Sequence, residues 1–553
     1  MTDTEIRFPR RKLAVQAQHG PDTRTAFIMR CRALFLVVAF ELAVLAAAGS
    51  APGRAPRALR SAAGGVRRIG QVSVNALKKV GGAFRLAFLG RMAEHSGLSG
   101  RGVVSMTPVR DDLEEFFAAW RNPFDPSNPD GYIVLLVAEN KLTWSMLQKR
   151  LEAAAEGQTI PAWVVTPCCV FDGVFGARIA VLLDLARLDC LSTQAGYGDF
   201  RGEERFRAAL AGMMETTFVH APVDKDAVLV QAGCSAILDS LAWCLGEEGD
   251  ACIVPAPVYP AFANDFWARA RVHLKMAQTH HPDYSLTREV LDQAYGECLS
   301  EGKPPKMLLL CNPCNPTGRV YSRETLEMCV RWAEERGIHL ISDEIYANSL
   351  FPGEAFVSVA RVCADLHGGT RGDRYLGDFV HITYGLSKDW AMSGVRGGVL
   401  FTHNDKLTAA VSNLACFNGM SSYAQWVLTS VFEDSAWVAQ YIRTNQEKLR
   451  ACYAALEEAL ACVDVPVTPC QGTLMAWADF RKHLKEQSWA GELALWKDLF
   501  ARSKILLTTG QSCHSAVPGF FRVCFAWPAV TPDDPAAAMR VLKSRLLRHF
   551  GNA

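Results

Sequence analysis

Short apolar runs alternate with amphipathic helical patterns through the middle of this chain. The runs 306–313 ("KMLLLCNP"), 338–342 ("IHLIS") and 380–383 ("VHIT") are apolar over most of their length, as strands buried on both faces are. Between the first two runs, Ser322 can begin a helix and Gly337 can end it. The alternation predicts an α/β fold with a mostly parallel sheet and helices on both of its faces.

Length and composition narrow the class of protein. The chain has 553 residues, of which 50% are hydrophobic, so it can form more than one domain. A net charge of +1 and the lack of a basic arm argue against a nucleic-acid partner. Its 18 cysteines are scattered through apolar segments and are expected to be free thiols in a reducing compartment. Cys311 and Cys314 are a close pair, but no second pair has zinc-ligand spacing, so no metal site is expected.

Residues 1–108 differ in composition from the rest and are predicted to be a targeting or disordered leader. The apolar run 33–48 contains one charged residue, and it is short for a membrane span. It fits the core of a signal peptide better, and Met29 would then be the true start in place of Met1.

Residues 42–93 contain no acidic residue and nine Lys or Arg, which is typical of an organelle transit peptide. A signal followed by a transit segment predicts an organelle location, with a plastid favoured. A membrane anchor formed by 33–48 and a cytoplasmic protein with a disordered leader are the alternatives.

Polar residues stand where the predicted strands end. Asp343 follows one strand, Asn315 comes shortly after another, and Lys388 comes after a third. Ligands bind beyond the carboxyl ends of strands in such sheets, so we expect these side chains to lie together. Lys388 can serve as the amine that binds the aldehyde of pyridoxal phosphate covalently.

Pyridoxal phosphate requires further groups, and the chain contains a candidate for each. Asp343 suits the pyridine nitrogen, Tyr346 or Asn315 the phenolic oxygen, and Tyr259 the face of the ring. A turn and helix start within 227–246 offers free backbone amides to a phosphate. The phosphate candidates there and near Lys388 are Cys234, Ser235, Ser387 and Arg396. Ordinary turn chemistry explains each of these residues taken singly.

Several segments resemble one enzyme family. The segments 312–318 ("NPCNPTG"), 342–346 ("SDEIY") and 387–398 ("SKDWAMSGVRGG") resemble class I/II pyridoxal-phosphate aminotransferases of fold type I. The branch of 1-aminocyclopropane-1-carboxylate (ACC) synthases is similar at 128–140 ("NPDGYIVLLVAEN"), 196–210 ("GYGDFRGEERFRAAL") and 510–526 ("GQSCHSAVPGFFRVCFA"). The resemblance covers roughly residues 120–545.

The resemblance implies a role for each candidate residue. Lys388, Asp343 and Tyr346 would be catalytic, with Asn315 and Tyr346 at the phenolic oxygen. The other implied cofactor contacts are Cys234, Ser235, Ser387 and Arg396 at the phosphate, Tyr259 at the ring, and Tyr197 at the phosphate of the neighbouring subunit. On the substrate side, Arg522 would bind the α-carboxylate with its planar fork, and Glu139 matches a glutamate of the synthase branch.

The resemblance also implies architecture and activity. It predicts a large cofactor domain at 180–425, and a smaller α+β domain from 109–179 and 426–553, in a homodimer. The first hypothesis is an ACC-synthase-like lyase that acts on S-adenosylmethionine, and an aminotransferase is the alternative. A catalytically silent binding protein is a third reading, against which the retention of Lys388, Asp343 and Arg522 argues.

Two positions depart from the family pattern. Phe200 stands where the synthase branch has a tyrosine, and Gly385 replaces a serine that can donate to the phosphate. We expect the cofactor to bind despite both changes. The changes bear instead on which reaction the site catalyses.

Overall fold

The computed structural model describes residues 112–156, 198–526, 534 and 536–551. The chain divides into two units, Met1–Met106 and Thr107–Ala553. The predicted leader 1–108, with its apolar run, lies outside the described residues, so its role as an address stays a prediction. Within the described ranges, no helix combines the length and the apolar character needed to cross a membrane.

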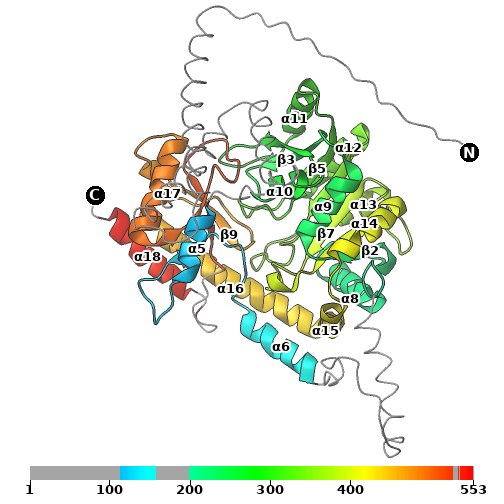
Figure 1. The fold of residues 1–553 in the computed structure, drawn as a ribbon, viewed down its shortest axis with the longest axis horizontal. Coiled ribbons are helices and arrows are strands. Elements are labelled where there is room, and N and C mark those ends of the chain that lie inside the picture. The colour runs from blue at the N-terminus through cyan, green and yellow to red at the C-terminus, as the bar shows by residue number, and fades with distance from the viewer. Residues whose placement is uncertain (1–111, 157–197, 527–533, 535, 552–553) are drawn as a thin grey trace, which may run out of the picture. The chain divides into compact units, whose positions relative to one another are not determined.

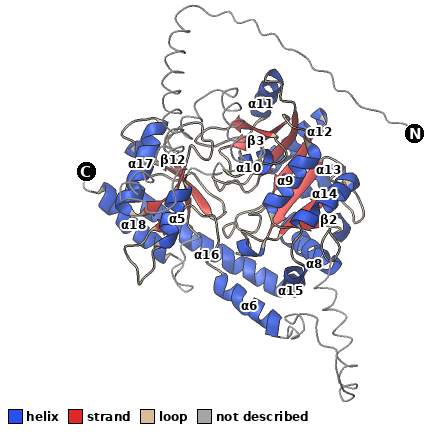
Figure 2. Cartoon of the chain, in the orientation of Figure 1, coloured by secondary structure: helices blue, strands red, loops and turns tan. Residues whose placement is uncertain are grey.

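A seven-stranded sheet forms the centre of the second unit (Figures 1 and 2). Its strands, in spatial order, are β2 (Val228–Gln231), β8 (Gly398–Thr402), β7 (Val380–Gly385), β6 (His339–Asp343), β5 (Pro305–Cys311), β3 (Ala251–Ala256) and β4 (His273–Gln278). Strand β8 runs antiparallel to both of its neighbours, whereas β7, β6, β5, β3 and β4 are parallel. The prediction of a mostly parallel sheet is confirmed.

Apolar side chains cover both faces of this sheet because successive residues of a strand point to opposite sides. In β5, Met307 and Leu309 belong to one core, and Leu308 and Leu310 belong to the other. The first core includes residues of α9 (Cys234–Leu245), α10 (Phe262–Trp267) and α14 (Asp405–Asn418). The second core includes residues of α8 (Glu204–Met214), α11 (Arg288–Ser300), α12 (Arg323–Arg336) and α13 (Val359–His367).

Helix α12 shows how local sequence sets the element boundaries. The Ser322 hydroxyl accepts a hydrogen bond from the backbone N–H of Thr325 at 3.2 Å, which caps the first turn. Gly337 ends the helix with a φ of +61°, a left-handed conformation that glycine adopts without steric cost. Strand β6 follows directly and ends at Asp343, so the predicted strand end is where the structure places it.

A second, smaller set of elements combines segments from both ends of the unit. Strand β1 (Ile133–Val134) pairs in parallel with β10 (Ile505–Leu506), so an early and a late segment lie side by side. An antiparallel sheet has the order β11 (Thr508–Thr509), β12 (Phe520–Cys524) and β9 (Met475–Asp479). The remaining long helices are α5 (Leu113–Arg121), α6 (Trp144–Glu156), α15 (Ser422–Phe432), α16 (Ser435–Ala461), α17 (Trp489–Ser503) and α18 (Ala537–Phe550). Of these, α5, α16, α17 and α18 also bury residues in the first core, and α6, α15 and α16 bury residues in the second. The domain boundaries near 179 and 425 stay predictions.

No disulfide is formed among the cysteines of the described residues. Fourteen cysteines there are free. The same part of the chain contains no cluster of three His, Cys, Asp or Glu residues that could hold a metal ion.

Candidate active site

A cavity of about 120 Å³ lies at the carboxyl ends of β5, β6 and β7. Nine of the residues predicted from the sequence border it: Cys234, Ser235, Tyr259, Asn315, Asp343, Tyr346, Ser387, Lys388 and Arg396. They come from segments more than 150 residues apart in the chain, and the shared sheet edge brings them together. The structure therefore places these predicted site residues around one cavity.

Lys388 stands three residues after the end of β7 and borders this cavity. Its Nζ donates a hydrogen bond to the backbone carbonyl of Ala138 at 2.5 Å. Burial lowers the pKa of Lys388, because a desolvated ammonium is less stable than a neutral amine. A larger fraction of this lysine is thus a free amine at neutral pH, which is the form that attacks an aldehyde.

Asp343 ends β6 and is 4% exposed. Its Oδ1 accepts weak hydrogen bonds from the N–H of Ile345 at 3.3 Å and the hydroxyl of Thr383 at 3.4 Å. Its Oδ2 accepts none from the described residues, and burial raises the pKa of the carboxyl to about 7. A cationic N–H donor in the cavity would satisfy this oxygen and stabilise the carboxylate.

Asn315 connects the two sides of the site. Its Nδ2 lies 3.4 Å from the hydroxyl of Tyr346, as expected if both groups contact one ligand oxygen. Its Oδ1 accepts a hydrogen bond from Nη1 of Arg522 at 3.0 Å. Tyr259 borders the same cavity, and its ring packs edge-on against Phe262 with the centroids 5.3 Å apart.

The predicted phosphate cradle is the turn at Gly233, whose backbone lies close to the guanidinium of Arg396. Gly233 precedes α9 with a φ of +93°, and a Cβ on it would lie 2.5 Å from Nη2 of Arg396. Arg396 donates to the carbonyls of Ala232 at 3.2 Å and Ser393 at 3.0 Å. The first amides of α9 and this guanidinium together favour an anion at the helix start.

Gly385 is explained by its neighbour in the cradle. The Cys234 thiol donates a hydrogen bond to the carbonyl of Tyr384 at 3.1 Å, and burial raises the pKa of this thiol. A Cβ on Gly385 would lie 2.8 Å from the Cys234 sulfur and 3.2 Å from the carbonyl oxygen of Gly397. The thiol therefore occupies the space that a serine at 385 would need.

Restoring serine at position 385 is accordingly expected to destabilise the protein. Gly385→Ser should cost about 1–3 kcal/mol, the usual range for overpacking a core. Cys234→Ala empties the space, so the same substitution should cost less in a Cys234→Ala protein. Thermal unfolding of the four proteins measures both costs, and equal losses in the two backgrounds would show that the sulfur is not the obstacle.

Arg522 lies on β12, where it is 4% exposed. Besides Asn315, it donates through Nη2 to the carbonyl of Leu136 at 2.9 Å and the hydroxyl of Thr508 at 3.1 Å. Its Nε is buried and has no hydrogen-bond partner among the described residues. Arg522 does not border the cavity directly and reaches its edge through Asn315. A carboxylate bound there would satisfy the unpaired Nε.

Glu139 and Tyr197 complete the predicted set. Glu139 is not among the residues that border the cavity, but its carboxylate bonds to Ser393, which does. Tyr197 lies outside the described residues, so its contact with a second subunit stays a prediction.

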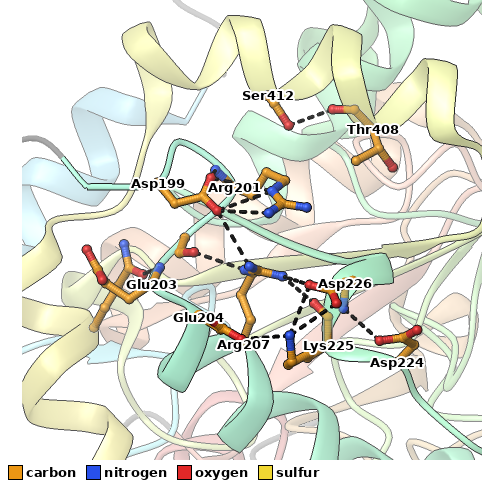
Figure 3. Close-up of polar contacts among 12 residues, drawn as sticks. Asp199, Arg201, Glu203, Glu204, Arg207, Asp224, Lys225, Asp226, Thr408 and Ser412 are labelled. Atoms are coloured by element: carbon orange, nitrogen blue, oxygen red, sulfur yellow. Dashed lines mark hydrogen bonds and ion pairs between the residues drawn. The ribbon is translucent and has the colours of Figure 1, made fainter.

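The segment that follows Tyr197 is held in place by a buried arginine, as Figure 3 shows. Arg207, 1% exposed, donates to the carbonyls of Gly202 at 2.9 Å and Lys225 at 2.6 Å. It also contacts the carboxylates of Asp199 and Asp226. Within this segment the side chain of Phe200 is 49% exposed and does not border the cavity. The hydroxyl that a tyrosine would carry at position 200 is therefore not missing from the lining of this chain's own cavity.

Three site residues were missed by sequence reasoning. Thr383 and Ser393 stand within five residues of Lys388, so proximity to that lysine was the available signal. Asp265 borders the cavity from α10, its Oδ2 lies 3.5 Å from the Ser235 hydroxyl, and burial raises the pKa of its carboxyl to about 7. The signal for Asp265 was a single acid in a short, mainly apolar helix shortly after Tyr259.

Known proteins resemble this chain in sequence over most of its length. The family model for aminotransferase class I and II matches residues 179–542. ACC synthase 3 of Oryza sativa subsp. japonica is 32% identical over 436 residues, which cover 76% of this chain and 90% of that protein. ACC synthase 6 of Arabidopsis thaliana is 31% identical, covering 78% of this chain and 83% of the relative.

The fold is also known from solved structures. A double mutant of Thermus thermophilus aspartate aminotransferase superposes with a TM-score of 0.61 at 20% identity, covering 81% of this chain and 99% of that one. At this identity the likeness concerns the fold alone. Together, the fold, the cavity and the family match define the class: the chain belongs to the aminotransferase class I and II family. It is an enzyme of this family, whose members depend on pyridoxal phosphate.

Proposed function

We propose that this enzyme binds pyridoxal phosphate through Lys388 and catalyses an ACC-synthase-like elimination on S-adenosylmethionine. The observation that carries the choice of reaction is the sequence identity of 31–32% to ACC synthases over about three quarters of the chain. In this proposal Lys388 binds the cofactor, Asp343 pairs with its pyridine nitrogen, and Arg522 binds the substrate carboxylate.

The residues around the cavity fit this cofactor. The free Oδ2 of Asp343 suits a protonated pyridine nitrogen, and the close pair Asn315 and Tyr346 suits a phenolic oxygen. Gly233 has a φ of +93° and carries no side chain between the backbone and the Arg396 guanidinium, so a phosphate can approach the backbone amides of α9. Ser235, Ser387 and Arg396 border the same cavity.

Bound pyridoxal phosphate withdraws electrons from the Cα of an attached amino acid and so acidifies its Cα–H bond. Arg522 would hold the substrate carboxylate, which orients the Cα toward Lys388. The amine of Lys388 would accept the α-proton, because burial favours its neutral form. In the elimination, a bond forms between Cα and Cγ while the bond from Cγ to sulfur breaks. Methylthioadenosine leaves, and the α-proton remains with Lys388 until solvent accepts it.

An aminotransferase reaction is the second candidate. The departure at Phe200 favours it, since the synthase branch has a tyrosine at this position. In that reaction Lys388 would deliver the α-proton to the bound cofactor in place of solvent, and a 2-oxo acid would later receive the amino group.

One assay distinguishes the two reactions. The purified protein, loaded with pyridoxal phosphate, is incubated with S-adenosylmethionine and, separately, with pairs of an amino acid and a 2-oxo acid. We expect release of methylthioadenosine, with weaker amino-group exchange as a side activity. Rapid exchange without methylthioadenosine would refute the elimination and leave the aminotransferase. If Phe200→Tyr then restores methylthioadenosine release, the absent hydroxyl was the cause.

Two further features belong to this proposal. Family members are typically dimers, and we propose a homodimer in which Tyr197 reaches the phosphate of the neighbouring subunit. We also propose that residues 1–108 direct the protein to an organelle. The composition of 42–93 and the apolar run 33–48 support that address.

A further inference from the structure

Ser393 touches two of the predicted functional residues at once. It stands five residues after Lys388, in the short 3₁₀ turn Ser393–Val395, and borders the cavity. Its hydroxyl donates a hydrogen bond to Oε1 of Glu139. Its backbone carbonyl accepts one from Nη1 of Arg396 at 3.0 Å. A single residue thus joins the arginine of the phosphate cradle to the substrate-side carboxylate.

The Glu139 carboxylate has few other anchors. Its Oε2 lies 3.3 Å from Nζ of Lys141, but the side chain of that lysine is 43% exposed, and such ion pairs hold weakly. Glu139 itself is 24% exposed, and no further hydrogen bond to its carboxylate occurs in the described part of the chain. The Ser393 hydroxyl is therefore its most directional contact.

The backbone next to Glu139 contacts the reactive amine, and the Glu139 carboxylate interacts electrostatically with it. The carbonyl of the preceding residue, Ala138, accepts the hydrogen bond from Lys388, and the carbonyl of Leu136 accepts one from Arg522. A fixed negative charge at this place favours the protonated state of the lysine, against the effect of its burial. The other charged or titratable groups that interact electrostatically with Lys388 are Arg522 and Cys524 on β12, Cys234 on α9 and Asp343 on β6.

We propose that Ser393 is a positioning residue that fixes the Glu139 carboxylate beside the amine of Lys388. This inference rests on the proposed function, since it concerns the basicity of the lysine that would bind the cofactor and accept the α-proton. Without the Ser393 hydroxyl, the carboxylate can turn toward Lys141 and solvent, and its charge then acts on Lys388 from farther away.

The test is a pH titration of the absorbance of the protein loaded with pyridoxal phosphate, because the spectrum reports protonation at the cofactor-bound lysine nitrogen. We expect Ser393→Ala to lower the midpoint by about 0.3–1 pH unit, and Glu139→Gln to lower it at least as far. Ser393→Thr retains the hydroxyl and should keep the parent midpoint. In the Ser393→Ala/Glu139→Gln double variant the midpoint should equal that of Glu139→Gln alone.

The control is Ser412→Ala, which removes a serine hydroxyl bonded to the carbonyl of Thr408 on α14, away from the cavity. An unchanged midpoint in Ser393→Ala would overturn the inference. The inference would also be overturned if Ser393→Ala shifted the midpoint by the same amount in the Glu139→Gln protein as in the parent. Ser393 would then act independently of the Glu139 carboxylate. If Ser393→Ala fails to fold, Ser393→Cys serves as the variant with a weak donor of similar size. If the parent protein binds no cofactor, the proposed function fails and this inference fails with it. If the parent binds the cofactor and its absorbance changes with pH, the variants test the role of Ser393 separately.

Discussion

Replacement of Lys388 by alanine is expected to abolish covalent attachment of pyridoxal phosphate and to reduce turnover by at least about 10²- to 10⁴-fold, the range for loss of a general acid–base group. The structure places no other lysine among the residues that border the cavity. Borohydride reduction followed by peptide mapping measures the attachment, and in the parent protein the label should lie on the peptide that contains Lys388.

Lys448 provides the matched control for this experiment. It is half-buried on α16, and its Nζ donates to the backbone carbonyl of Leu142 at 2.7 Å, much as Lys388 donates to Ala138. It does not border the cavity, so Lys448→Ala should retain the label. Label on another lysine in the parent, or undiminished label in Lys388→Ala, would show that the cofactor assignment is wrong.

The sheet and its site edge were predictable because their causes are local. Apolar strands, the Ser322 cap and the Gly337 stop specify β5, α12 and β6 almost residue by residue. Once the strands are parallel, Asp343 and Lys388 must share an edge, so the principal chemical residues of the cavity followed from the pattern and from the family resemblance.

The residues that sequence reasoning missed depend on contacts that no periodic pattern contains. Asp265 is in the site because α10 packs beside α9, and the Ser393 hydroxyl acquires a partner only when a segment 254 residues earlier folds across it. From the sequence alone, glycine in place of serine at position 385 was interpreted as the loss of a phosphate donor. Its packing cause, the Cys234 sulfur, became visible only in three dimensions.

Replacement of Arg522 by lysine is expected to weaken binding of the amino-acid substrate by about 1.5–3 kcal/mol, which is the range for hydrogen bonds to charged groups. Lysine keeps the positive charge but cannot make two parallel bonds to a carboxylate. It also cannot donate at once to Asn315, Thr508 and the carbonyl of Leu136, as the guanidinium does. Because Arg522 lies outside the residues that border the cavity, cofactor content should stay normal.

Titration of the absorbance of the loaded protein with substrate measures this affinity, and the absorbance before titration gives the cofactor content. Arg481→Lys is the control for the arginine-to-lysine exchange itself. Arg481 also makes two hydrogen bonds to a carboxylate, that of Asp479 at 2.9 and 2.6 Å, and it does not border the cavity. That variant should bind substrate like the parent. Loss of cofactor from Arg522→Lys with unchanged substrate affinity would assign Arg522 to the cofactor, and the unpaired Nε would then have another explanation than a substrate carboxylate.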